Sequence, residues 1–147
     1  MNVDAKDIEI LDILRQDCRI PNAQLANQVG LSASSCWRRV RALEDSGVVR
    51  NYTVSLDNEK MGMNFTAVVQ VHLSRHDEMQ VRAFQREVQA RSEIRECHAT
   101  TGQADYHLIV ECADIAAYNR FLEEVLFRLP AVDSVQSNVV LRTLKQG

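Results

Sequence analysis

Three stripes of apolar residues with helical spacing occur within the first 56 residues of the chain. They predict a helix over about residues 4–16, a short helix that ends at Gly30, and a third helix that begins after Ser32 and ends at Gly47. The buried faces of these helices are expected to consist of Ile10, Leu11, Ile13, Leu14, Leu25, Ala26, Val29, Cys36, Val40 and Leu43.

The last two of these helices have the layout of a helix-turn-helix, in which a turn of about three or four residues joins two short helices. Arg and small hydroxyl side chains lie off the apolar stripe of the third helix, so they can face a major groove, where Arg binds guanine and phosphate with two hydrogen bonds. The following stretch, VVRNYTVSL, alternates apolar and polar residues and predicts a strand, or wing. We expect the DNA-contacting residues to be Ser32, Ser34, Ser35, Trp37, Arg38, Arg39, Arg41 and Arg50.

A basic stretch such as WRRVR also occurs on helices whose charged face simply lies in water, and on that pattern alone the two interpretations are equally open. The order of three helices, with the basic one third, favours contact with DNA. Trp37 has two interpretations as well. We favour partial burial by packing over stacking or contact with a thymine methyl group.

The pattern changes after a polar, Gly-containing connection, DNEKMGMN. The predicted order beyond it is β-α-β-β-α-β, over residues 65–74, 77–91, 94–101, 105–112, 114–130 and 135–144. This order is typical of a ferredoxin-like sandwich, with both helices on one face of a four-stranded antiparallel sheet. The fold class is therefore α+β, with a winged helix-turn-helix domain at residues 1–60 and a ferredoxin-like domain at residues 61–147.

The predicted strands carry apolar residues on both sides, as Val68 beside Val69 and Val139 beside Val140 illustrate. The sheet face away from the helices is therefore expected to be too apolar to remain in water. We predict a homodimer through this face, which also gives the paired helices that a two-fold operator requires.

Composition and charge refine this picture. A content of 46% hydrophobic residues with only 5 Gly and 2 Pro predicts folded domains and excludes a disordered chain. No apolar stretch approaches the roughly 20 residues of a membrane span, and the first residues lack an apolar signal core, so we expect a cytoplasmic protein that contacts no membrane. The net charge of −3 argues against nucleic acid, but residues 1–56 carry 7 Lys and Arg against 7 Asp and Glu, so the acid excess lies entirely in the second part.

We expect no catalytic site, no metal site and no cofactor. The four cysteines, of which none belongs to a CxxC pair, are interpreted as small buried thiols. The four histidines lack the spacing of metal ligands on one helix face, although His98 and His107 lie on neighbouring arms of the hairpin and could approach each other. No serine lies in a G-x-S-x-G pattern.

Several stretches in consistent order and spacing resemble the Lrp/AsnC family of feast/famine transcriptional regulators, and the resemblance covers almost the whole chain. It is carried by DAKDIEILDIL, LANQVGLSASSCWRRVRALEDSGVV, the stretch around Tyr52, TGQADYHLIV, AAYNRFLEEVL and SNVVLRTLK. The resemblance implies a bacterial or archaeal, nucleoid-associated protein. Its first domain would bind DNA, and its RAM/ACT-like second domain would assemble the protein and bind a small effector, commonly an amino acid.

The resemblance also implies where the effector binds. Dimers in such proteins usually assemble into tetramers, octamers or hexadecamers, and the effector lies between dimers, at the loop that matches residues 102–106 and near the last strand. Gly102 allows close approach of the backbone, backbone N–H groups can hold a carboxylate, and Asp105 can accept from an ammonium group, whereas a plain hairpin turn is the alternative. The loop is smaller and less acidic than is usual in the family, which leaves the effector's identity open. The effector-binding residues expected on this basis are Gly102, Gln103, Ala104, Asp105, Tyr106, Ser137 and Asn138.

We interpret the chain as a regulator, not an enzyme, that binds specific double-stranded DNA and responds to an amino acid or related metabolite. An effector between dimers would change the spacing or number of half-sites bound at once. Two alternatives stay open. One is a metabolite-binding or enzymatic ferredoxin-like protein whose helical arm contacts protein, and the other is a nucleoid-organising protein that binds DNA with little sequence preference.

Overall fold

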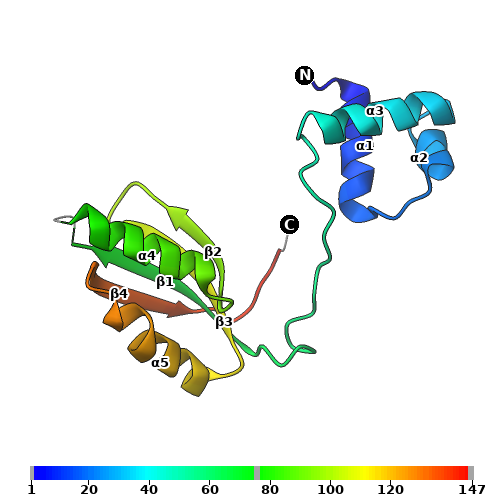
Figure 1. The fold of residues 1–147 in the computed structure, drawn as a ribbon. Helices are drawn as coiled ribbons and strands as arrows, with labels where there is room; N and C mark the ends of the chain where they lie inside the picture. The colour runs from blue at the N-terminus through cyan, green and yellow to red at the C-terminus, as the bar shows by residue number, and fades with distance from the viewer. Residues whose placement is uncertain (1, 75–76, 146–147) are drawn as a thin grey trace. The chain divides into compact units, whose positions relative to one another are not determined.

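A computed structural model describes residues 2–74 and 77–145, and the chain divides into two compact units, Met1–Ser55 and Leu56–Gly147 (Figure 1). Within the described ranges, no helix combines the length and the apolar character needed to cross a membrane. The first unit contains α1 (Ala5–Gln16), α2 (Asn22–Gln28) and α3 (Ala33–Asp45). The second contains β1 (Phe65–Leu73), α4 (Glu78–Ala90), β2 (Ile94–Ala99), β3 (Tyr106–Cys112), α5 (Ile115–Glu124), the 3-10 helix η1 (Leu126–Arg128) and β4 (Val132–Val139).

The helices of the first unit begin and end at the residues that the sequence predicts. Asp4 and Ser32 each accept a hydrogen bond from a backbone N–H group of the first turn, at 2.9 and 3.2 Å. Gly30 and Gly47 follow α2 and α3 with φ angles of +68° and +75°, which lie in the left-handed region that ends helices. The buried apolar side chains of this unit are Ile10, Leu25, Ala26, Val29, Cys36 and Leu43.

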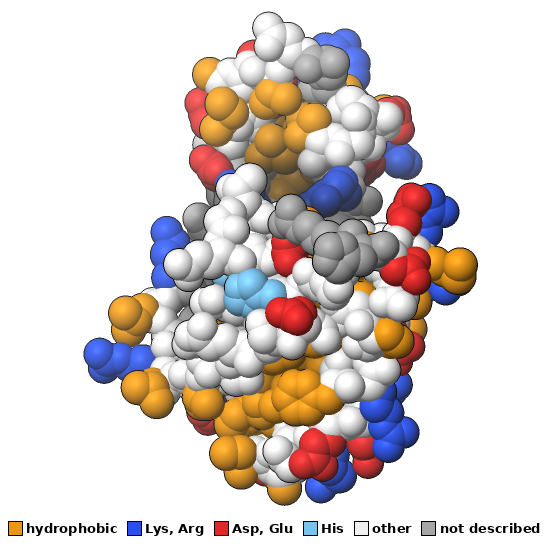
Figure 2. All heavy atoms as spheres, turned by 90° about the vertical axis from the view of Figure 1, so that its left-hand side faces the viewer, with side chains coloured by type: hydrophobic (Ala, Val, Ile, Leu, Met, Phe, Trp, Pro, Cys, Tyr) orange, Lys and Arg blue, Asp and Glu red, His pale blue; other side chains and the backbone are white. Residues whose placement is uncertain are grey.

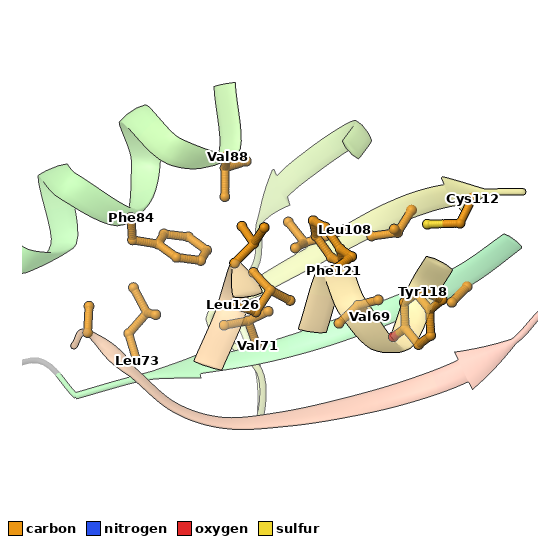
Figure 3. Close-up of a cluster of buried hydrophobic side chains, with 14 residues drawn as sticks. Val69, Val71, Leu73, Phe84, Val88, Leu108, Cys112, Tyr118, Phe121 and Leu126 are labelled. Carbon is orange, nitrogen blue, oxygen red and sulfur yellow. The ribbon is translucent and has the colours of Figure 1, made fainter. Parts of the chain in front are cut away.

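The strands of the second unit form one antiparallel sheet in the order β2-β3-β1-β4. Both long helices cover the same face of the sheet, because alternate residues of β1 and β3 share one buried cluster with residues from α4 and α5. Figure 3 shows Phe84 and Val88 of α4, and Tyr118 and Phe121 of α5, over these strand residues. The predicted ferredoxin-like sandwich is therefore confirmed.

The expected wing is not formed as a strand. Residues 50–57 belong to no helix or strand, although the segment alternates apolar and polar side chains as a strand does. A β-strand needs a neighbour for its backbone N–H and C=O groups, and no described segment of the first unit pairs with this one. Its apolar side chains are consequently exposed, with Tyr52 at 49%, Val54 at 73% and Leu56 at 51%. The final strand also differs from the prediction, since it starts and ends earlier, at Val132 and Val139.

The sheet face away from the helices is mostly polar, which corrects the expectation of an apolar face. The strand register places Val69 and Val139 on the helix side. Among the described strand residues, the apolar side chains of the central strands on the uncovered face are those of Val68 and Ile109. Their neighbours on that face are Glu96, His98, His107, Gln70, His72, Ser134, Gln136 and Asn138. The face has fewer apolar side chains than the sequence suggests, and the homodimer through it stays a prediction.

The cysteines differ in burial. Cys36 and Cys112 are buried, whereas Cys18 and Cys97 are exposed, so the interpretation of all four as buried thiols is wrong. Cys18 follows the end of α1, and Cys97 lies on the edge strand β2, where one side of the backbone has no neighbouring strand.

Candidate DNA interface and ligand loop

Side-chain hydrogen bonds hold α2 and α3 of the helix-turn-helix in place. The Asn22 Nδ2 group, at the start of α2, donates to the Ala33 carbonyl oxygen at 2.8 Å, at the start of α3. From α1, Lys6 Nζ donates to the Val29 carbonyl oxygen at 2.9 Å, which lies just beyond the end of α2. These bonds satisfy backbone carbonyls around the turn and limit how the two helices can move against each other.

The outer face of α3 presents a hydroxyl, an aromatic ring and two guanidinium groups. Ser34, Trp37, Arg38 and Arg41 are all exposed. Trp37 is 56% exposed, so its ring is partly buried and still presents more than half of its surface. The Arg41 guanidinium carbon lies 5.7 Å from the centroid of the Trp37 ring, within the range of a cation–π interaction. The ring is thus available at the surface together with its basic neighbours.

Arg39 differs from the other arginines of α3. Its Nη1 atom lies 2.8 Å from Asp4 Oδ2 and 2.8 Å from Asp7 Oδ1, so it forms two ion pairs with the start of α1. These two carboxylates raise the pKa of the Arg39 guanidinium further. Local partners within the unit therefore already occupy the Arg39 side chain, and its predicted contact with DNA would compete with these ion pairs.

The remaining arginines of the predicted interface have different surroundings. Among the described residues, no carboxylate lies within ion-pair distance of Arg38 or Arg50, and both are exposed. Arg41 pairs with Glu44 at 3.3 Å, and Glu44 also accepts a 2.7 Å hydrogen bond from the Tyr52 hydroxyl. Partial burial and this hydrogen bond raise the pKa of Tyr52 to about 12. The Tyr52 hydroxyl therefore links the extended segment to the end of α3.

Charge is distributed in a mixed way elsewhere on the surface. On the face shown in Figure 2, basic and acidic side chains are interspersed, and hydrophobic side chains form separate small groups. This face therefore offers no single field of positive charge.

The loop between β2 and β3 has an open backbone at Gly102. This residue has a φ of +120°, which L-residues with a side chain rarely adopt, and no heavy atom lies within 4 Å of where a Cβ would be. Gly102 and Gln103 are both exposed. The geometry allows a ligand to approach the backbone closely, and it equally serves a tight hairpin turn.

The rest of the loop is fixed to the end of β1. Ala104 is only 3% exposed, so its side chain offers little surface to a ligand. The Asp105 N–H group donates to the Val71 carbonyl oxygen at 3.0 Å, and Asp105 Oδ2 accepts from the Leu73 N–H group at 2.8 Å. The structure thus uses the Asp105 carboxylate to anchor the loop on the central strand.

Of the other expected effector residues, Tyr106 directly follows the loop as the first residue of β3, whereas Ser137 and Asn138 on β4 lie apart from it within one chain. The Tyr106 ring packs against α4. The Ser137 and Tyr118 hydroxyl groups share a hydrogen bond on the helix side of the sheet, whereas Asn138 lies on the uncovered face, where its Nδ2 group donates to a β1 carbonyl oxygen at 3.5 Å. Because β1 separates β4 from β3, one chain does not bring the loop together with Ser137 and Asn138.

Two polar residues beside the loop escape the sequence prediction. Thr100 Oγ1 donates to a loop carbonyl oxygen and lies 3.0 Å from His107 Nδ1. His72 Nδ1 is buried and has no hydrogen-bond partner among the described residues. The alternation of His72 with apolar neighbours in β1 is a usable signal for the uncovered face, but it does not indicate that His72 lies at the loop end of that face. Thr100 follows β2 outside any strand, so no alternation marks it.

The histidines do not form a metal site in the part of the chain that the structure describes. His98 and His107 are paired across β2 and β3, yet His98 Nε2 lies 2.9 Å from Glu96 Oε2 instead. Within residues 2–74 and 77–145, no three His, Cys, Asp or Glu side chains gather closely enough to hold a metal ion. His76 lies outside the described residues.

Family comparisons agree with both units. The winged helix-turn-helix DNA-binding family matches residues 3–50, and the Lrp/AsnC ligand binding domain matches residues 66–147. The leucine-responsive regulatory proteins of Escherichia coli K12 and Salmonella typhimurium LT2 are each 37% identical to this chain over 146 residues, which are 99% of this chain and 89% of the relative.

Solved structures of similar fold support the same family assignment. A transcriptional regulator from Neisseria meningitidis, in complex with L-Met, has a TM-score of 0.95 at 33% identity and covers 99% of this chain and 94% of its own. The feast or famine regulatory protein of M. tuberculosis, complexed with L-methionine, has a TM-score of 0.88 at 27% identity. The match covers 99% of this chain and 96% of the M. tuberculosis chain. An AsnC family transcriptional regulator from Agrobacterium tumefaciens has a TM-score of 0.91 at 32% identity. The match covers 97% of this chain and 93% of the A. tumefaciens chain. With a helix-turn-helix followed by this ligand binding domain, the chain belongs to the Lrp/AsnC family of transcriptional regulators.

Proposed function

We propose that this protein binds specific duplex DNA through the outer face of α3 and that an amino acid changes this binding through the second unit. The observation that carries the DNA proposal is the capped helix α3 with Trp37 and Arg38 exposed and Arg38 without a carboxylate partner among the described residues. Such a guanidinium can bind guanine or phosphate without first breaking an ion pair. The protein acts in the bacterial cytoplasm and without enzymatic chemistry.

L-Methionine and L-leucine are the first effector candidates. Two relatives with the same fold were solved with L-methionine, and other relatives are named for their response to leucine. The open backbone at Gly102 suits a carboxylate, and the separation of the loop from Ser137 and Asn138 within one chain suits a site completed by a second copy.

Assembly into dimers and larger closed oligomers is part of the proposal. Support comes from apolar side chains in extended segments, since Val54 is 73% exposed, Leu141 is 94% exposed and Leu144 is 85% exposed. Side chains of this kind favour burial against another copy. Analytical ultracentrifugation with and without effector measures the assembly, and a monomer under all conditions would contradict it.

The DNA proposal is tested with Arg38→Ala. A duplex is first selected from a random library by the wild-type protein, and its affinity is then measured over a range of salt concentrations. We expect Arg38→Ala to weaken binding about tenfold and to reduce the salt slope by about one, because one cation is lost from the interface. Arg82→Ala is the matched control, since Arg82 is an exposed arginine of α4 that pairs with Glu78, and it should change neither quantity.

Other outcomes of this test favour the alternatives. A wild-type protein that binds no duplex at all would support a metabolite-binding protein whose helical unit contacts protein. Equal affinity for selected and scrambled duplexes would support a nucleoid-organising protein, because specific binding normally exceeds non-specific binding by about 10³-fold or more.

The effector proposal is tested by a thermal-shift screen of the amino acids. A ligand that binds only the folded state stabilises it by about 2.7 kcal/mol at 100 times its Kd, so L-methionine or L-leucine should raise the melting temperature. Gln103→Ala should weaken this shift, whereas Gln89→Ala, at an exposed position of α4, is a control of the same chemistry. An effector response that is unchanged in Gln103→Ala would remove Gln103 from the proposed site.

A further inference from the structure

The ion pairs of Arg39 join the middle of α3 to the first turn of α1. The Asp4 carboxylate accepts from the Asp7 N–H group at 2.9 Å, and the Asp7 carboxylate accepts from the Asp4 N–H group at 3.1 Å, which is a reciprocal capping box. Arg39 donates to both carboxylates at 2.8 Å. One guanidinium therefore closes a network whose other members already start α1.

Asp7 is the buried member of this network. Its side chain is 3% exposed, and it is the one buried charged residue among the described parts of the chain. A buried carboxylate is stable only when it is paired and hydrogen-bonded. Arg39 supplies that pairing. The Arg39 guanidinium is therefore held at the buried Asp7 carboxylate and does not move freely in solvent.

The network adds a polar attachment beside the core contacts of α3. Cys36 and Leu43 attach α3 to the hydrophobic core of the first unit. Arg39 is three positions after Cys36 and four before Leu43, so it flanks the core-facing side of α3, while the neighbouring Arg38 points into solvent. Ion pairs to the start of α1 at the flank of these apolar contacts restrain the rotation of α3 about its own axis, and this rotation sets where Arg38 and Ser34 point.

We propose that Arg39 is a positioning residue for sequence-specific DNA binding. Through Asp4 and Asp7 it fixes the rotation of α3 relative to α1, and it contributes no cation to the phosphates. The proposal rests on the proposed DNA-binding function. Contacts to base edges require an accurate helix orientation, whereas contacts to phosphates tolerate small displacements. Loss of the network should therefore reduce specific binding more than non-specific binding.

Arg39→Gln in the full chain is the main test, with Arg38→Gln as the matched control one residue away. Both variants are compared at a temperature where circular dichroism shows them folded. We expect Arg39→Gln to weaken binding to the selected duplex about tenfold, to leave binding to a scrambled duplex within about twofold, and to keep the salt slope of the wild type. Arg38→Gln should lower both affinities and reduce the slope by about one.

Asp7→Asn separates positioning from charge. Its side chain is buried and carries the same sign of charge as DNA, so its neutralisation cannot remove a phosphate contact. We expect the same selective loss as in Arg39→Gln, and the double variant should lose no more than the larger single loss, because both changes break one network. If Asp7→Asn does not fold, Asp4→Asn replaces it, since the Asp4 side chain is 53% exposed.

Two results would overturn the proposal. One is a salt slope reduced by about one in Arg39→Gln, with equal losses on selected and scrambled duplexes, which would make Arg39 a phosphate contact. The other is additive losses in the double variant. A wild-type protein that binds no DNA would instead contradict the proposed function and leave the ion-pair network as a feature of stability, which thermal unfolding of the same variants measures.

Discussion

The two units of this protein are stabilised in different ways. The sheet unit buries fourteen hydrophobic residues in one cluster and, among its described residues, no charged side chain. The helical unit buries six hydrophobic residues together with the Asp7 carboxylate. A unit of about 55 residues has little interior, so polar contacts hold a larger share of its structure. The part proposed to bind DNA therefore depends on hydrogen-bond geometry, and the part proposed to bind an effector depends on packing.

The largest expected effect is on the packed core of the sheet unit. Phe84 is fully buried between α4 and the sheet, and its replacement by Ala leaves a cavity. We expect Phe84→Ala to lower the free energy of unfolding of this unit by about 3–5 kcal/mol. Urea unfolding followed by circular dichroism and by Trp37 fluorescence separates the units, because the one tryptophan reports on the helical unit. An equal shift of the Trp37 signal would show that the units do not unfold independently.

A smaller effect in the other unit comes from Asp7→Asn. Breaking a buried ion pair generally costs about 3–5 kcal/mol, but Arg39 is about one-third exposed, so we expect about 2 kcal/mol. This loss of stability should shift the unfolding transition that Trp37 fluorescence reports. The unfolding transition of the sheet unit should not change. A loss below about 0.5 kcal/mol would mean that the small apolar core holds the helical unit by itself.

Gly102→Ala tests backbone strain without a steric clash. No heavy atom lies within 4 Å of the added Cβ, so the cost arises from the φ of +120° alone. We expect a loss of about 1–2 kcal/mol in the stability of the sheet unit, measured by its urea midpoint. Gly62→Ala, which has a φ of +76° and equal space, is a matched control in the connection before β1 and should cost less. A neutral Gly102→Ala would show that the loop relaxes freely.

The smallest effect is a dependence on pH in the helical unit. The hydrogen bond from the Asp7 N–H group and the Arg39 guanidinium lower the pKa of Asp4 from its usual 3.8. A carboxyl group whose pKa is lower in the folded state stabilises that state above its unfolded pKa, and this contribution is lost as pH falls through the folded value. The stability difference between the wild type and Asp4→Asn should therefore narrow below about pH 4. A constant difference from pH 6 to pH 2 would contradict it.

Local patterns in the sequence determine most of the fold. Caps such as Asp4 and Ser32, the glycines that end α2 and α3, and alternation in β1 are each readable from neighbouring residues, and the structure contains all of them. The missing wing shows the limit of such patterns. Alternation in residues 50–57 predicts a strand only if a partner is present, and the described residues of the first unit supply none.

Contacts between distant residues are what the sequence does not reveal. Arg39 and Asp7 are 32 positions apart, and Arg39 has the same local sequence character as Arg38. The apolar or polar nature of the uncovered sheet face depends on which residue of each strand pairs with which, and a shift of one residue exchanges the faces. Asp105 likewise looks available for a ligand in the sequence but holds the loop on β1.

The most direct test of the central claim is fluorescence anisotropy of a labelled duplex selected by the full-length protein, titrated with and without saturating L-methionine or L-leucine. We predict salt-sensitive binding that is about 10³-fold or more tighter than to a scrambled duplex, and a change in affinity or stoichiometry with one of the amino acids. Equal binding to both duplexes, with no change on adding any amino acid, would contradict it.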